Sequence, residues 1–190
     1  MHAAKGVLQN FFFARKRPGT IMDEVPSLHW KDDVYYCQHP SRKQARDACL
    51  QRVNWKALCE YASSINADEP CSLLDKSTIG GVHLIRLLSF GGTQWIARVQ
   101  LEPSTPTTAS LLRAEIHAME LVRARTDIPV PKIFGYELDS TNRVGAAFIL
   151  MEFLPGSSAM DADGGYEVHH GSISPKRQSV FYKQIASIQV

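Results

Sequence analysis

Arg98 and Glu115 are the two residues whose types and positions could do chemistry together. Arg98 stands in the middle of GGTQWIARVQLEP, residues 91–103, where apolar and polar side chains alternate as in a β-strand. Glu115 falls within the apolar stripe of the helix predicted over 105–125, when each residue turns the helix by about 100°. A carboxylate that faces a hydrophobic core is costly unless a cation meets it. The two residues therefore predict a partly buried ion pair. The alternative is that water surrounds Arg98 and that the flexible side chain of Glu115 extends its carboxylate to solvent.

Such a pair requires a strand and a helix that pack together, and the chain has the pattern of both. Two strand-like runs within CSLLDKSTIGGVHLIRLLSF are interrupted at 76–81, and a tight turn at Gly91–Gly92 leads to a third strand. A Thr105 cap and Pro106 at the first helical position begin the helix. Two more strands follow, in DIPVPKIFGYELD and AAFILMEFLPG, before a linker and a last helix around 176–190. This order of strands and helices predicts an α+β fold.

The segments ahead of the strands differ in how much pattern they carry. Residues 1–30 show no helical or strand period, and we expect a disordered or poorly structured extension over 1–40. Residues 41–66 are predicted to form a helical segment, because their apolar side chains recur at helical spacing until NADEP breaks the pattern.

Composition and charge limit the classes of partner and location. The 190 residues are 44% hydrophobic and carry a net charge of +2, which argues against a nucleic-acid or membrane surface. No run of about 18 apolar residues occurs, so we predict no membrane span. The four cysteines form no C-x-x-C pair, which favours reduced thiols in a cytoplasmic protein over a zinc site. The basic start MHAAKGVLQNFFFARKRPG leaves a mitochondrial presequence as the alternative.

Three stretches of the chain, WIARVQL, EIHAMELVRARTDIPVPKIFGYE and FILMEFLPG, together resemble the aminoglycoside phosphotransferase family, which is kinase-like in fold. More narrowly, they are similar to its fungal branch of uncharacterised members. The resemblance covers about residues 59–190. It implies a protein-kinase-like small lobe and hinge over 67–156, with a five-stranded antiparallel sheet plus one helix. Residues 157–190 would then be a linker and the first helix of a truncated C-terminal lobe.

The resemblance also implies a nucleotide site with ATP as the cofactor. Arg98 stands where the family has the strand lysine or arginine that contacts nucleotide phosphates, and Glu115 matches its helix partner. Gly80 and Gly81 lie where the loop over the phosphates belongs, although a plain hairpin turn explains two glycines equally well. Met151, Glu152 and Phe153 correspond to the family's hinge, whose backbone pairs with an adenine edge. A buried strand explains this stretch equally well.

The catalytic motifs of the family are missing from this chain. The family supplies its base and metal ligands from a His-Gly-Asp motif, a following Asn and an Ile-Asp motif. HHGSISP at 169–175 has Ser172 in place of the Asp, and no Asp or Glu occurs from 168 to 190. Asp161 and Asp163 are available as replacements, with solvated linker residues as the alternative. We therefore expect no catalytic residue and no metal ligand here, ATP binding that is weak or lost, and Mg²⁺ only in a full-length relative.

The sequence leaves three functions open. The preferred one is the N-terminal, nucleotide-binding portion of an aminoglycoside-phosphotransferase-like kinase, inactive alone, as a truncated product, a short isoform or a degenerate copy. The alternative is a non-catalytic protein-interaction module or pseudokinase fragment, in which the ion pair is only structural. The third is an active enzyme that uses a different acid.

The last helix predicts a protein partner or self-association. Its apolar residues would pack against a C-terminal lobe in the complete fold, and otherwise stay exposed and lower the solubility of the chain. These residues are Phe181, Tyr182, Ile185 and Ile188.

Overall fold

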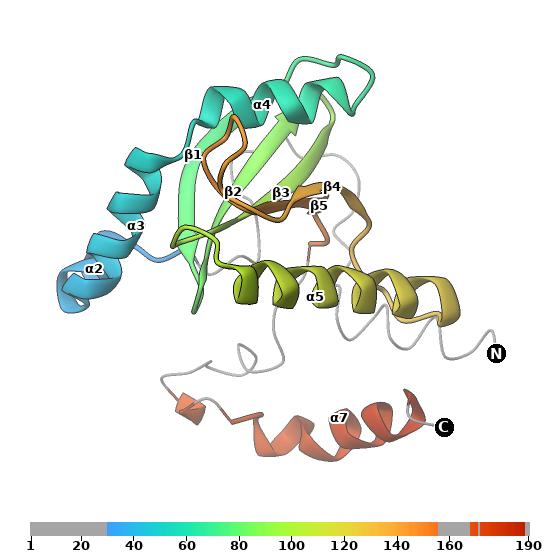
Figure 1. Cartoon of the computed structure of the whole chain (residues 1–190). Helices are drawn as coiled ribbons and strands as arrows, with labels where there is room; N and C mark the ends of the chain where they lie inside the picture. Colours follow the sequence, from blue (N-terminus) through green and yellow to red (C-terminus); the bar gives the residue numbers. More distant parts are fainter. Residues whose placement is uncertain (1–29, 156–167, 171, 189–190) are drawn as a thin grey trace. The chain divides into compact units, whose positions relative to one another are not determined.

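The structure is a computed structural model that describes residues 30–155, 168–170 and 172–188 (Figure 1). It divides into two compact units. The first, residues 30–124 and 130–153, holds the sheet and is called the sheet unit below. Its elements are α2 (Asp33–Gln38), α3 (Pro40–Arg52), α4 (Trp55–Ser64), β1 (Ser72–Ile79), β2 (His83–Phe90), β3 (Thr93–Gln100), α5 (Pro106–Arg125, whose last residue belongs to the other unit), β4 (Ile133–Glu137) and β5 (Phe148–Glu152). The other unit contains α7 (Pro175–Ile188).

The five strands form one antiparallel sheet in the order β1-β2-β3-β5-β4. Strand β5 is the last of the five in the chain, yet it lies between β3 and β4. This architecture confirms the predicted α+β class, with a five-stranded antiparallel sheet, one internal helix, preceding helices and a C-terminal helix.

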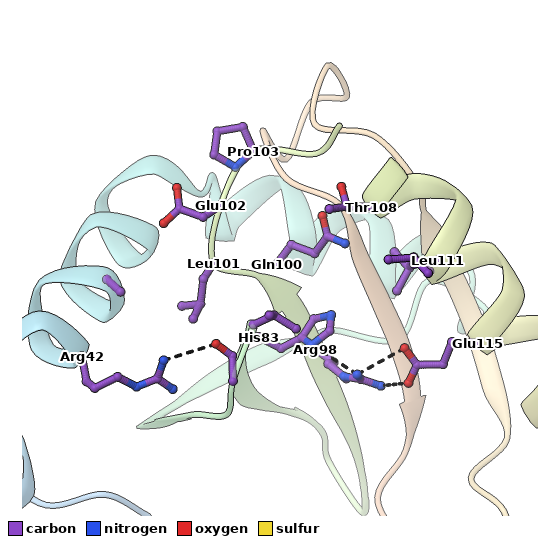
Figure 2. A pocket seen from close by; sticks show the side chains of 14 residues that line it. Arg42, His83, Arg98, Gln100, Leu101, Glu102, Pro103, Thr108, Leu111 and Glu115 are labelled. Atoms are coloured by element: carbon purple, nitrogen blue, oxygen red, sulfur yellow. Dashed lines mark hydrogen bonds and ion pairs between the residues drawn. The ribbon is translucent and has the colours of Figure 1, made fainter. Parts of the chain in front are cut away.

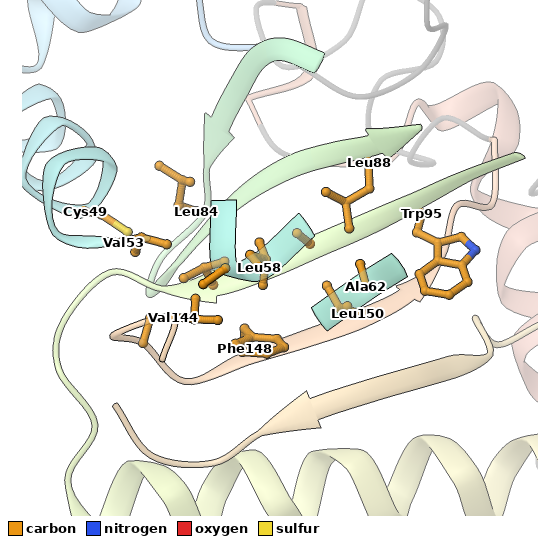
Figure 3. Packing of buried hydrophobic residues seen from close by; sticks show 14 of the residues in the cluster. Cys49, Val53, Leu58, Ala62, Leu84, Leu88, Trp95, Val144, Phe148 and Leu150 are labelled. Carbon is orange, nitrogen blue, oxygen red and sulfur yellow. The ribbon is translucent and has the colours of Figure 1, made fainter. Parts of the chain in front are cut away.

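One face of the sheet packs against α4 (Figure 3). Trp95, Ala97 and Val99 of β3 are buried there, in a cluster to which α4 contributes Leu58 and Ala62. These three strand residues are the apolar half of the alternation seen in the sequence. The other half of β3, including Arg98, therefore faces away from α4.

The opposite face packs against α5, so helices cover both faces of the sheet (Figure 1). Ile149 and Met151 of β5 form a second buried cluster with Leu112 and Ile116 of α5. Ile96 of β3 packs against the same cluster. The polar face of β3 therefore meets the helix that carries Glu115.

A two-residue turn at Gly91–Gly92 sets the register between β2 and β3. Gly91 has φ +63°, in the left-handed region that side chains disfavour and glycine tolerates. Phe90 pairs with Thr93 across this turn.

Helix α5 begins close to the residue that the sequence predicts. The Thr105 hydroxyl oxygen accepts a hydrogen bond from the Thr108 N–H at 3.1 Å, and the Thr108 hydroxyl oxygen accepts one from the Thr105 N–H at 2.8 Å. These reciprocal bonds satisfy backbone donors at the start of the helix.

The buried face of α5 differs from the predicted stripe. Leu112 and Ile116 are buried, whereas Leu111 is 65% exposed. The helix is turned toward β5 around these two residues, so Glu115 lies at the edge of the stripe rather than within it.

Two features correct the expected boundaries of elements. Helix α2 lies within the segment 1–40 that was expected to be poorly structured; six residues are too short to show a period, but the Asp32 carboxylate caps the helix by accepting from the Tyr35 N–H at 2.8 Å. Residues 1–29 of that expectation lie outside the described part. The break predicted at 76–81 is confirmed only at its end: β1 continues to Ile79, with a register shift in its pairing with β2 before Ser77, and the turn to β2 begins at Gly80.

Helix α7 presents apolar side chains to solvent within its own unit. Tyr182 is 60% exposed and Ile185 is 36% exposed, while Phe181 is half-buried. In the part of the chain that the structure describes, no helix is long and apolar enough to cross a membrane. Asp161 and Asp163 lie outside the described residues.

Candidate functional site

The predicted ion pair between Arg98 and Glu115 is confirmed. Arg98 Nη1 contacts Glu115 Oε1, and Nη2 donates to Oε2 at 3.3 Å, so the guanidinium and carboxylate pair through two atoms each (Figure 2). The side chains are 24% and 37% exposed, which makes the pair partly buried. A two-point pair of this kind fixes the plane of the guanidinium as well as its charge.

His83 is a third member of this group, and it was not predicted from the sequence. Its Nδ1 lies 3.2 Å from Arg98 Nη2, and the residue is 8% exposed. Burial and the neighbouring Arg98 charge lower the pKa of His83 to about 4, with Glu115 opposing the shift. The ring is therefore neutral near pH 7.

The turn between β1 and β2 is fastened by Arg42 of α3. Arg42 Nη1 donates to the Gly81 carbonyl oxygen at 3.2 Å, and Nη2 contacts the Gly80 carbonyl oxygen. The Gly80 N–H donates to the His83 carbonyl oxygen at 2.9 Å. The two glycines thus form a turn whose carbonyls are held by a helix that precedes the sheet.

These groups surround an open cavity of about 470 Å³ (Figure 2). It is bounded by α3, the β1–β2 turn, the end of β3 and the first turns of α5. The exposure of Leu111 follows from its place in this wall. Residues that line the cavity include Arg42, Gly81, His83, Arg98, Leu111 and Glu115.

The charges around the cavity are balanced. Arg42 and Arg98 contribute two positive charges, and Glu102 and Glu115 contribute two negative charges. His83 adds none at neutral pH. The cavity therefore combines individual guanidinium donors with no net positive charge.

The hinge residues lie elsewhere and do not line this cavity. Met151 is buried on the sheet face that carries Arg98, in the cluster with α5. Glu152 is tied to Lys132: its N–H donates to the Lys132 carbonyl oxygen at 2.8 Å, and its carboxylate accepts from the Lys132 N–H at 3.0 Å. Phe153 is half-buried. The structure thus brings Gly81, Arg98 and Glu115 together with Gly80 beside them, and leaves the nucleotide role of all seven residues a prediction.

A signal for His83 was present in the sequence. Because the Gly91–Gly92 turn pairs Phe90 with Thr93, each step along β3 matches one step back along β2, and His83 pairs with Gln100. Residues on β2 with the parity of His83 therefore share a face with Arg98. Arg42 left no such signal, because its contact with the turn depends on how α3 packs.

The described residues contain no group of three or more His, Cys, Asp or Glu side chains that could hold a metal ion. The four cysteines are free thiols.

Comparison with known proteins finds distant relatives over part of the chain. A subtelomeric hrmA-associated cluster protein of Aspergillus fumigatus is 37% identical over 92 residues, which cover 46% of this chain and 17% of that protein. Altered inheritance of mitochondria protein 9, mitochondrial, of Saccharomyces cerevisiae is 32% identical over 83 residues, which cover 44% of this chain and 13% of that protein. The match thus spans less than a fifth of either relative. No family profile matches the chain, and no solved structure does.

Proposed function

We propose that the sheet unit is the nucleotide-binding lobe of a kinase-like phosphotransferase, similar to the aminoglycoside phosphotransferases and not catalytic by itself. The observation that carries this proposal is the Arg98–Glu115 ion pair in the wall of a cavity that the β1–β2 turn bounds on one side. Protein kinases pair a strand lysine with a helix glutamate to aim a positive charge at nucleotide phosphates. The same element types supply the pair here, with arginine in place of lysine.

The pairing of β3 with β5 places the proposed hinge relative to Arg98. Arg98 lies opposite Ile149, and the hinge begins two residues further along β5 at Met151, a rise of about 7 Å. If the phosphates of a nucleotide lay beside Arg98, its base would have to leave the cavity to reach the hinge, because the hinge residues do not line the cavity.

We expect this lobe to bind ATP weakly. The charges around the cavity cancel, and Arg98 is already paired with Glu115, so neither long-range attraction nor an unpaired cation favours a triphosphate. One lobe also buries less of a ligand than a closed cleft does. A dissociation constant of about 1 mM or higher is the expected range. We expect a Mg²⁺ site only in a longer relative of this chain.

The experiment is chemical denaturation of the chain with and without ATP. At about ten times the dissociation constant, ATP should raise the free energy of unfolding by about 1.4 kcal/mol. Arg98→Ala should abolish this increase. Arg143→Ala is the matched control, because Arg143 is 88% exposed and does not line the cavity, and it should preserve the increase.

A second function, a protein-interaction module, is favoured by the exposed Tyr182 and Ile185 of α7. In that case ATP at concentrations up to about 10 mM would leave the stability of the wild-type chain unchanged, and the first proposal would fail. An increase that survives Arg98→Ala would place the nucleotide somewhere other than the proposed cavity.

The cellular location is a proposal as well. Cytoplasm remains our first choice, and the name of the yeast relative supports the mitochondrial alternative for the basic start of the chain. Those first residues lie outside the described part.

A further inference from the structure

The imidazole of His83 has a defined role toward Arg98. We propose that His83 is a positioning residue: its neutral ring accepts a hydrogen bond from Arg98 and holds the guanidinium against the sheet while Glu115 holds it from the helix. The effect on a bound nucleotide rests on the proposed function; the positioning itself does not.

The direction of the hydrogen bond follows from chemistry. A guanidinium carries five N–H donors and no acceptor, so Nδ1 of His83, 3.2 Å from Arg98 Nη2, must be the accepting atom. Nδ1 is then unprotonated, and the neutral ring carries its proton on Nε2. The geometry thus selects one of the two neutral tautomers.

The other ring nitrogen of His83, Nε2, makes a histidine at this position unfavourable for stability. Nε2 is buried and has no hydrogen-bond partner among the described residues, although it carries the proton. A buried donor without a partner destabilises a fold. An apolar side chain at 83 would avoid this penalty, and it would also remove the acceptor for Arg98. The arrangement is understandable if the acceptor is what position 83 supplies.

Two elements therefore fix one side chain. Glu115 comes from α5 and is 37% exposed, so the ion pair alone could swing outward with the carboxylate. His83 comes from β2 and is 8% exposed, so it provides a fixed point beneath the guanidinium. Loss of the imidazole acceptor should leave the ion pair formed but free to move.

The first test uses the wild-type chain with ¹⁵N-labelled histidine. At pH 7, NMR should show that His83 is neutral, with the proton on Nε2 and Nδ1 unprotonated. A proton on Nδ1, or a charged ring, would overturn the proposal. This measurement requires neither a variant nor a nucleotide, so it decides the matter even if substitutions at 83 prevent folding.

The second test compares three substitutions at 83. His83→Asn keeps an acceptor near the position of Nδ1, His83→Gln places its amide near Nε2, and His83→Leu removes all polar atoms. The separate Nη–H resonances of Arg98, which require slow rotation of the guanidinium, should persist in His83→Asn and merge in the other two. If His83→Leu keeps them, or His83→Asn loses them, the acceptor does not position Arg98.

ATP binding gives a third, separable result. His83→Leu and His83→Gln should weaken ATP binding by about tenfold, the equivalent of one lost hydrogen bond, and His83→Asn should restore it to within about threefold. If the wild-type chain binds no ATP while the NMR results hold, the nucleotide function fails and the positioning role stands. If ATP binds the wild type and His83→Leu equally well, the role of His83 toward the nucleotide is refuted.

Discussion

The guanidinium of Arg98 has two intramolecular partners before any ligand arrives. Glu115 takes donors from both Nη atoms, and His83 takes a second bond from Nη2. Because arginine has five N–H donors, it can keep these partners and still donate to a ligand oxygen. A lysine has three donors on one nitrogen and would have to share them. The site is thus built for arginine, although the resemblance alone allows either residue.

Titration of His83 should make stability depend on pH. The pKa of His83 is about 4 in the folded chain and about 6.5 in an unfolded one, so the unfolded state binds more protons between these values. The contribution of the neutral ring to the free energy of unfolding is fully present above about pH 7, and it is lost as the pH falls from about 6.5 to 4. The loss should be about 1 to 3 kcal/mol.

The measurement is urea denaturation of wild type and His83→Asn across this pH range. Carboxylates also titrate in this range, but the two proteins contain the same carboxylates. Arg98 and Glu115, the charged groups that face the ring, are likewise present in both proteins. The difference in free energy of unfolding should therefore shift against the wild type as the pH falls. A difference that stays constant from pH 7 to 4 would show that the ring does not titrate as expected.

Prediction from the sequence succeeded where the relevant geometry is local. The Arg98–Glu115 pair followed from strand alternation, helical rotation and the order of the two elements. His83 required one further step, the register across the Gly91–Gly92 turn. Arg42 could not be predicted, since no local period indicates that α3 lies beside the β1–β2 turn.

Among the helices, α3 is joined to the sheet at its last residue. Arg52 Nη1 donates to the Gly145 carbonyl oxygen at 2.7 Å, and Nη2 donates to those of Gln100 and Leu101 at 3.0 Å each. One side chain thus connects the end of α3, the end of β3 and the loop before β5. The end of β3 also forms part of the cavity wall, so Arg52 supports the site without lining it.

Arg52→Met should destabilise the sheet unit by about 2 to 3 kcal/mol, because it removes charge-assisted bonds and leaves three carbonyl oxygens without this donor. Arg143→Met is the control. It removes an arginine that is 88% exposed and 3.6 Å from Glu60, and it should cost less than about 0.5 kcal/mol. Urea denaturation of the two variants checks this, and equal effects would exclude the proposed role of Arg52.

The boundaries of elements were predicted best where a cap or turn determines them. The Thr105 cap and the Gly91–Gly92 turn depend on neighbouring residues, and both were read correctly. The length of β1 depends on pairing with β2 across a shift in register, which a single strand does not reveal. Helix α2 is shorter than two turns, so its apolar residues show no repeat.

The whole chain has two units, and the distant relatives extend well beyond the matched part. Helix α7 belongs to the unit without the sheet, and its apolar side chains are exposed at Tyr182 and Ile185. The activity of a complete relative can therefore depend on residues outside the matched part. Self-association through α7 is a prediction.

We expect the 190-residue chain to form oligomers through α7. Ile185→Lys places a charge on the apolar side chain and should shift the protein toward monomer in size-exclusion chromatography with light scattering. Ala186→Lys adds the same charge at an exposed neighbour and is the control. A monodisperse monomer for the wild type would contradict the prediction, and an equal shift in both variants would indicate a general effect of charge.

The position of β5 also has a consequence for synthesis on the ribosome. The strand emerges last of the five, but it must enter between β3 and β4, and it brings Phe148 and Leu150 into the cluster under α4. A nascent chain that ends before residue 148 therefore carries two strands with unpaired edges and an incomplete core. We therefore expect the sheet unit to complete its fold only after residue 152 has left the exit tunnel, and the incomplete sheet to be prone to aggregation until then.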